Sequence, residues 1–455
     1  MATRFSVRAL IAAFLFSLSS SAPLSAQEDW PNWLGESGTG AITDSNLVEE
    51  FSEDGPPVVW RQPIGPGYTG PSVENGRLFV MDRTDENGDG IALENGNREG
   101  LDGGERVMCL DANTGEEIWS HNYDCPYTIQ YPNGPRCTPT CDGDHVYTLG
   151  AMGHLICFKS ENGEIVWEKN LADEYGAKPP IWGYASHPVV DGDNLLVPAA
   201  GEGSGAGVVA LNKMTGEEIW RAVETVDVAY APLVFYEHEN ERQLIFWHSD
   251  GISSLNPETG EEFWNVKFPE EVNPSNTSIT TPAIIDDLLM ISEFYKGAIV
   301  IELDSNPPAA RELWRTSKQP AANAESLNSL MSSLVHKDGY AYGVTGLGHF
   351  RCLEIETGDM QWTVDDWMEP GERPVMFATA FLFENEGRYF VFNDIGELMI
   401  IKLSPEGMEE ISRAKILEPT SVARGRQVVW SHPAAAGGMM YLRNDAEIVC
   451  LDLRK

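Results

Sequence analysis

A recurring segment that ends in tryptophan constrains this chain more than any other feature. In five copies a Thr-Gly or Asn-Gly pair precedes a tryptophan, with the glycine four residues before it; a sixth, degenerate copy spans 301–314. These copies end at Trp119, Trp167, Trp220, Trp264, Trp314 and Trp362, and a further tryptophan, Trp60, precedes them. The intervals of 44 to 59 residues are typical of four-stranded propeller blades rather than of helical repeats.

The chemistry of each copy agrees with a blade. An alternating stretch leads into the turn, where glycine supplies the positive φ of a type I turn followed by a G1 bulge. The following stretch is the outgoing strand, and its tryptophan can stack on the neighbouring blade. Upstream, segments such as 138–150 and 187–198 contain Asp-Gly between two strand signals, which predicts a hairpin.

Two further blades lack the motif. Residues 377–416 have the strand order but carry Ile411 where tryptophan is expected, and the last stretch holds three strands without an outgoing one. The segment 58–63 is an outgoing strand without a blade of its own, so we expect it to complete the C-terminal blade. The sequence therefore predicts an all-β, eight-bladed propeller whose ring is closed by the N-terminal strand, which removes exposed sheet edges. A pair of β-sandwiches would not explain the shared motif.

The N-terminus and the charge indicate where such a propeller works. Residues 1–26 combine Arg4 and Arg8 with an apolar run and small residues, the pattern of a cleavable signal peptide. We therefore expect a periplasmic or secreted chain, a single domain over 27–455, without a transmembrane segment and monomeric. A net charge of −39 excludes nucleic acid as a partner, because phosphate backbones would be repelled.

The outgoing motif closely resembles the tryptophan-docking motif of pyrroloquinoline-quinone (PQQ)-dependent alcohol dehydrogenases, which are eight-bladed. The segments 123–140, 175–188 and 242–251 resemble a bacterial group of exported PQQ-like propellers. A more distant relative of the same superfamily is the β-barrel assembly lipoprotein of the outer membrane, a scaffold without cofactor. The resemblance thus implies the fold and leaves two functions open.

The dehydrogenase resemblance implies calcium and quinone over the central channel, a metal-binding Glu, an Asn ligand, an adjacent cysteine pair and a catalytic Asp. Glu202 falls where the metal-binding Glu is expected. The next ligand position offers His248 and Asp250, no two cysteines are adjacent, and no segment matches that of the catalytic Asp. We therefore expect a non-catalytic binding or scaffold protein, with a PQQ- and calcium-dependent alcohol or sugar dehydrogenase as the alternative.

The sequence suggests two other candidate metal sites. His187, His248 and Glu202 could together hold zinc or copper, but without a short-range ligand motif isolated polar residues in the channel are the simpler interpretation. Residues 85–90 resemble half of a calcium loop, yet Gly96 occupies the position of the bidentate Glu. These residues belong to an acidic, glycine-rich insertion, 82–106, which we expect to be a solvated loop.

The seven cysteines fall into two groups. Four share one position in the repeat and are most simply small core residues: Cys109, Cys157, Cys352 and Cys450. The other three are Cys125, Cys137 and Cys141, and in an oxidising compartment a Cys125–Cys137 disulfide is the preferred expectation. A metal or redox site at Cys137 and Cys141 is the alternative.

The most distinctive surface lies in the loops that enter the innermost strands. In a propeller these loops crowd one mouth of the channel, and here they carry aromatic residues beside Arg, Lys and His: Tyr127, Tyr131, Asn133, Arg136, Lys178, Trp182, Tyr184, His187 and Tyr230. Such a set suits a sugar, a quinone or an extended peptide. Alternatively, several of them pack the loops together. We expect the partner to be a small-molecule or sugar ligand, or a protein of the cell envelope.

Overall fold

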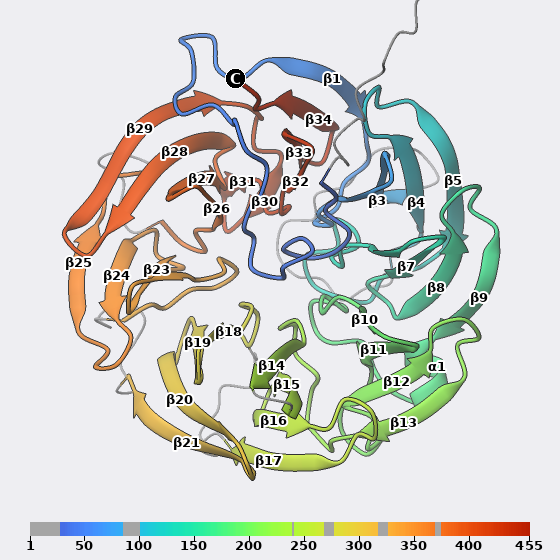
Figure 1. The fold of residues 1–455 in the computed structure, drawn as a ribbon. Coiled ribbons are helices and arrows are strands. Elements are labelled where there is room, and N and C mark those ends of the chain that lie inside the picture. Colours follow the sequence, from blue (N-terminus) through green and yellow to red (C-terminus); the bar gives the residue numbers. More distant parts are fainter. Residues whose placement is uncertain (1–27, 85–100, 239–240, 268–276, 317–325, 369–374) are drawn as a thin grey trace, which may run out of the picture.

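The computed structural model describes residues 28–84, 101–238, 241–267, 277–316, 326–368 and 375–455. Within these ranges the strands form eight four-stranded antiparallel sheets, arranged as blades around a central axis (Figure 1). The predicted eight-bladed propeller is confirmed. Its closure is also as predicted, because β1 (Val58–Pro63) pairs with β34 (Glu447–Asp452) at the outer edge of the last blade.

The other strands follow the ring in chain order, each blade running from the axis outward. The first three blades are β2 (Ser72–Glu74), β3 (Arg77–Thr84), β4 (Gly104–Asp111) and β5 (Glu117–Asp124); β6 (Thr140–Asp142), β7 (His145–Leu149), β8 (His154–Lys159) and β9 (Ile165–Asn170); and β10 (Val189–Asp191), β11 (Asn194–Pro198), β12 (Val208–Asn212) and β13 (Glu218–Ala222). The next two are β14 (Val234–His238), β15 (Glu241–His248), β16 (Gly251–Leu255) and β17 (Glu262–Lys267); and β18 (Ala283–Ile285), β19 (Leu288–Glu293), β20 (Gly297–Ser305) and β21 (Pro308–Arg315). The ring ends with β22 (Val335–Lys337), β23 (Tyr340–Val344), β24 (Phe350–Glu354) and β25 (Met360–Val364); β26 (Ala380–Asn385), β27 (Arg388–Asn393), β28 (Glu397–Ser404) and β29 (Gly407–Lys415); and β32 (Ala434–Ala436) and β33 (Met439–Arg443) beside β34.

The repeated tryptophans join each blade to the next. The Trp119 indole N–H donates to the Ser160 carbonyl of the following blade at 3.0 Å, and Trp60 bonds Ala112 in the same way. The ring lies against the turn glycine of that blade, so closely that a Cβ on Gly163 would be 2.6 Å from Trp119. Glycine is therefore required at this position for two reasons. Its φ of 72° is positive, and the indole face leaves no room for a Cβ.

Trp264 is an exception that follows from the degenerate copy. The turn of the next blade, between β20 and β21, carries Asn306 and Pro307 where the other copies have Thr-Gly. The Trp264 indole N–H instead donates to Gln243 Oε1 of its own blade at 2.8 Å. At this degenerate turn the indole N–H therefore does not bond the next blade, although the ring still packs against the cluster that contains Ile301 and Leu303.

An N-terminal segment crosses the channel, a feature that the repeat does not predict. Residues 28–47 (dark blue in Figure 1) run over the innermost strands, from the Trp30–Val73 bridge past β26 to the Leu47–Arg454 bridge. The Asn385 amide fixes this path by donating to the carbonyls of Ile42 and Asp44 at 2.8 and 2.9 Å. The segment therefore ties the first blade to the last two.

The predicted insertion is shorter than 82–106. β3 extends to Thr84 and β4 begins at Gly104, because residues 82–84 and 104–106 continue the ladder between these strands. The half calcium loop at 85–90 and the predicted signal peptide lie outside the described residues. The ring also carries a short helix, α1 (Leu171–Tyr175), and a two-stranded hairpin, β30 (Ser421–Ala423) and β31 (Arg426–Val428). In the part of the chain that the structure describes, no helix is long and apolar enough to span a membrane.

Candidate functional site

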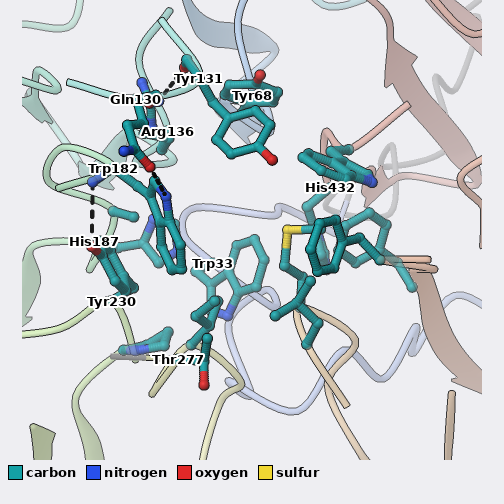
Figure 2. Close-up of a pocket in the computed structure, with 18 of the residues that line it drawn as sticks. Trp33, Tyr68, Gln130, Tyr131, Arg136, Trp182, His187, Tyr230, Thr277 and His432 are labelled. Carbon is teal, nitrogen blue, oxygen red and sulfur yellow. Dashed lines mark hydrogen bonds between the residues drawn. The ribbon is translucent and has the colours of Figure 1, made fainter. Parts of the chain in front are cut away.

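A cavity of about 370 Å³ lies where the loops entering the innermost strands meet. Every blade contributes to it, since the lining includes residues from each of the eight entering loops or the start of the strand that follows. Its walls are mostly aromatic: Figure 2 shows the rings of Trp33, Tyr68, Tyr131, Trp182 and Tyr230. Trp430 also lines the cavity. The predicted crowding of these loops at one channel mouth is therefore what the structure shows.

The floor of the cavity is an indole between two imidazoles. Trp33, from the N-terminal segment, stacks on His187 with ring centroids 4.5 Å apart and 17° between the planes. The His432 ring lies 4.2 Å from Trp33 on centroids, tilted by 48°. Trp33 Nε1 donates to Thr281 Oγ1 at 2.9 Å, which fixes the indole across the channel.

Both imidazoles are neutral. Burial, with a smaller contribution from the nearby His432, lowers the pKa of His187 to about 3. Burial likewise lowers the pKa of His432 to about 3. His187 Nδ1 accepts the Thr138 backbone N–H at 2.7 Å, so its proton is on Nε2.

One wall is organised by Arg136. Its guanidinium donates to the carbonyls of Gln130, Tyr131 and Gly134, which shapes the loop before β6. The same group lies over the Tyr68 ring, 5.2 Å from the centroid. Trp430 packs beside both tyrosines of this wall, with centroids 6.1 Å from Tyr68 and 6.0 Å from Tyr131.

The facing wall is a pair of aromatic rings. Trp182 and Tyr230 lie 5.2 Å apart on centroids, and the Tyr230 hydroxyl accepts the Trp182 backbone N–H at 3.3 Å. Trp182 Nε1 donates to Gln130 Oε1 at 3.3 Å, which joins this wall to the loop that carries Arg136 (Figure 2). Flat apolar faces with a few fixed polar groups suit a small ring-shaped ligand.

The structure brings four of the predicted ligand-binding residues together in the cavity lining and places the other three outside it. Tyr131, Arg136, Trp182 and His187 line the cavity, and their role in binding stays a prediction. Lys178 is exposed to solvent and lies outside the lining. Tyr184 is buried below the loop, with its hydroxyl donating to the Ala199 carbonyl at 2.6 Å. His248 is buried within its own blade.

Of the other residues named at this mouth, Tyr230 lines the cavity, whereas Tyr127 and Asn133 support the loops. The Tyr127 hydroxyl donates to the buried Glu105 carboxylate. Asn133 Nδ2 donates to Ser421 Oγ at 3.2 Å and to Asp445 at 3.3 Å, linking its loop to the β30–β31 hairpin. The interpretation that some of these residues pack loops together therefore holds for these two.

The metal ligands considered from the sequence do not meet. Glu202 is exposed and lies outside the cavity lining. His248 is held by Thr225 Oγ1 at 3.0 Å and Asp250 at 3.2 Å, in a buried polar cluster. Among the described residues, no group of three His, Cys, Asp or Glu side chains is placed to bind a metal ion.

The preferred Cys125–Cys137 disulfide is not formed, and this expectation was wrong for this structure. Cys125 Sγ faces His154 Nδ1 at 3.6 Å, whereas Cys137 Sγ points to the carbonyl of Ser186 at 3.4 Å. The two thiols belong to different hydrophobic clusters. All seven cysteines are buried free thiols, including Cys141 and the four at the repeat's core position.

Several cavity residues were missed from the sequence. Trp33 precedes the repeats, so no period marks it, and Arg424 lies in a hairpin that the blade pattern does not contain. His432 could have been found, because Ser-His-Pro occurs at both 186–188 and 431–433, immediately before an innermost strand. That repetition places two histidines at equivalent positions of two blades.

The family is shown by the sequence comparisons. A family profile described as outer membrane protein assembly factor BamB matches residues 103–364 and 251–455. A quinoprotein ethanol dehydrogenase from Pseudomonas aeruginosa is 32% identical over 130 residues, which is 25% of this chain and 19% of that protein. An uncharacterised protein from Rickettsia conorii is 24% identical over 266 residues, 56% of this chain and 59% of its own. The chain thus spans less than two thirds of the length of either relative.

Solved structures share the architecture. BamB from Moraxella catarrhalis superposes with a TM-score of 0.56 at 13% identity, over 87% of this chain and 99% of that one. Quinohemoprotein alcohol dehydrogenase from Comamonas testosteroni gives 0.54 at 14% identity, over 94% and 81%. At this identity the likeness is one of fold alone. With the family profile covering most of the ring, the chain belongs to the PQQ-like, BamB-type family of β-propeller repeat proteins.

Proposed function

We propose that this chain is a non-catalytic binding propeller whose small ligand occupies the aromatic cavity on the channel axis. The observation that carries the proposal is the cavity itself, built by loops of all eight blades and closed below by Trp33. Its volume of about 370 Å³ is that of a small-molecule site. A site assembled from every blade is held rigidly by the ring, which favours binding without reorganisation.

The titratable groups of the cavity support binding over catalysis. General acid–base chemistry needs a group whose pKa is near the working pH. His187 and His432 have pKa values of about 3 and stay neutral, and burial raises the pKa of Tyr68 above its ordinary value. These groups are suited to hydrogen bonding and stacking.

The residues present do not fit a PQQ and calcium centre. Calcium prefers oxygen ligands, above all carboxylates. Among the described residues that line the cavity there is no Asp or Glu, and Glu202 is exposed elsewhere. The similarity to quinoproteins favours the dehydrogenase alternative, but the described lining of the cavity lacks the carboxylate ligands that calcium would need.

The proposal includes a location in the periplasm or outside the cell. The signal-like residues 1–26 support export, and so does membership of a family described as an outer membrane protein assembly factor. Fractionation of cells that express the full chain tests the location.

A fragment screen by ligand-observed NMR tests the binding site. We expect ring-shaped fragments to bind, and Trp182→Ala to weaken them, since it removes one wall. Ile118→Ala is the matched control, because this exposed side chain on β5 lies outside the cavity. Hits that Trp182→Ala leaves unchanged would place binding elsewhere. In a parallel assay PQQ and calcium are added, and dye-linked oxidation of alcohols and sugars would overturn the non-catalytic proposal.

A further inference from the structure

The charge of the cavity is opposite to that of the chain. The protein carries 70 Asp and Glu against 31 Lys and Arg. The cavity lining nevertheless includes two arginines, Arg136 and Arg424, and no acidic residue among those described. Since His187 and His432 are neutral, these two guanidinium groups are the source of positive charge at the site. In an acidic protein, this local excess of positive charge attracts anions to the cavity.

Arg424 is placed by a hairpin that is not part of any blade. β30 and β31 pair through Ala423 and Arg426, which leaves Arg424 and Gly425 as a two-residue turn. Their φ values of 47° and 79° are both positive, as a two-residue type I′ turn requires, and Asn-Gly is the preferred pair in such turns. Arginine at the first position is strained, because its Cβ crowds the backbone in the left-handed region.

The same strain recurs around the cavity. Tyr131 has a φ of 51° and Phe377 a φ of 60°, and both side chains line the site with Arg424. Bulky residues rarely adopt this conformation. Such strain persists where the surrounding structure holds it, and it gathers at ligand sites. Three residues in this conformation therefore line one small cavity.

The contacts of the hairpin fix the direction of Arg424. Arg426 forms a bidentate pair with the buried Asp394, at 2.6 and 3.0 Å, which ties the hairpin to the neighbouring blade. The Arg424 guanidinium then lies over the Phe377 ring, 5.3 Å from its centroid. Arg136 lies over Tyr68 in the same manner. Within the described chain neither Arg136 nor Arg424 forms an ion pair with a carboxylate.

We infer that the cavity selects a compact, monocyclic carboxylate, with the ring between the aromatic walls, the carboxylate held by Arg424, and the charge of Arg136 adding to the attraction. Guanidinium groups bind carboxylates bidentately, and stacking on the Phe377 ring leaves the N–H edges of Arg424 available. Arg136 already donates to three backbone carbonyls, so it contributes mainly its positive charge. The inference deepens the proposed function and depends on it. The ring is either aromatic or that of an acidic sugar, since an aromatic ring and the C–H face of a sugar both present an apolar face to the Trp182 and Trp430 indoles.

Paired ligands test the inference by isothermal titration. 4-Hydroxybenzoate and galacturonate are compared with their neutral counterparts, 4-hydroxybenzyl alcohol and galactose. We expect at least one acid to bind about tenfold more tightly than its neutral partner, the usual gain from a charged hydrogen bond. The preference should shrink as NaCl rises from about 50 to about 500 mM, because salt screens the pair. Which acid binds distinguishes the aromatic from the sugar source.

Variants of Arg424 separate local recognition from overall charge. We expect Arg424→Gln to abolish most of the preference for the acid and Arg424→Lys to keep part of it. Arg311→Gln is the control, because Arg311, on β21, carries the same charge in an exposed ion pair with Glu302 of β20. Arg424→Asn should leave the melting temperature unchanged or higher, since Asn-Gly suits the turn, while affinity for the acid falls.

Different experimental outcomes would overturn the carboxylate selectivity and the proposed binding site. Equal binding of acids and neutral compounds, with loss in Trp182→Ala, would overturn the charge selectivity and keep the binding site. An equal effect of Arg311→Gln and Arg424→Gln would also overturn it, since overall charge alone would then explain the preference. If no ring compound binds in a way that depends on Trp182, the binding site itself is wrong.

Discussion

Trp33 and His187 form the wall between two chambers of the channel. Their stacked rings line both the aromatic cavity and a second space of about 850 Å³, bounded by the N-terminal segment and the innermost strands. An indole from one end of the chain thus closes a channel built by the rest of it. The partition is local, so a change in one side chain can join the two spaces.

Trp33→Ala should open the floor of the cavity. The substitution removes the stack on His187 and the hydrogen bond to Thr281, and we expect the free energy of unfolding to fall by about 2 kcal/mol, less than for a fully buried tryptophan. Affinity for any cavity ligand should fall about tenfold, because one face loses its contacts. Calorimetry and titration measure both quantities. Trp33→Phe keeps a ring and should retain most of the affinity; unchanged binding to Trp33→Ala would show that the indole is not part of the site.

The two neutral histidines should make stability fall in mild acid. In the folded chain their pKa values are about 3, against an ordinary value of 6.5, so between these pH values the unfolded chain binds more protons. The free energy of unfolding therefore decreases as pH falls from 7 to 5, by about 2 kcal/mol for each histidine. Denaturant titrations at several pH values measure this slope.

His187→Asn isolates one of the two contributions. The Asn Oδ1 atom can accept the Thr138 N–H in place of Nδ1, and the variant should lose about half of the slope assigned to the histidines. At pH 8 both imidazoles are neutral in either state, so a difference measured there reports lost packing alone. A slope identical to that of the original protein would mean that His187 has the same pKa in the folded and the unfolded chain.

The blades could be predicted because their cause is local and repeated. A glycine turn, an outgoing strand and a tryptophan recur along the chain, and five interfaces use the same contact of an indole on a turn glycine, as Trp119 does on Gly163. Even the exception at Trp264 is explained by a turn without glycine. Strand 58–63 could be assigned because a blade at the other end lacked one strand.

The position of the cavity could be predicted from the sequence, but most of the side chains that line it could not. The entering loops have no period, so nothing distinguishes Trp182, which faces the cavity, from Tyr184, which is buried two residues later. Trp33 and Arg424 reach the site from segments outside the blade pattern. Their positions depend on contacts between residues far apart in the chain, such as Trp33 with Thr281.

Gly163→Ala tests the contact that joins the blades. The new Cβ would lie 2.6 Å from the Trp119 ring, in addition to the strain of a left-handed φ. Gly192→Ala is the matched control, since Gly192 has a φ of 59° in a hairpin turn and its Cβ would meet nothing within 4 Å. We expect Gly192→Ala to destabilise the fold by about 1 kcal/mol and Gly163→Ala by about 2 kcal/mol more, in line with overpacking. Equal losses would show that the stacked indole contributes little to the joint between blades.

The seven thiols give a direct count of disulfides. Burial raises the pKa of Cys157 and of Cys450 to about 12, and only the thiolate reacts with a disulfide reagent. We expect Ellman's reagent at pH 8 to find no reactive thiol in the folded protein and seven after unfolding in guanidinium without reductant. A count of five would reveal a bridge, and peptide mapping would show whether it joins Cys125 to Cys137. Seven thiols in protein purified from the periplasm would mean that burial protects them even where oxidation is possible, because the reactive thiolate does not form.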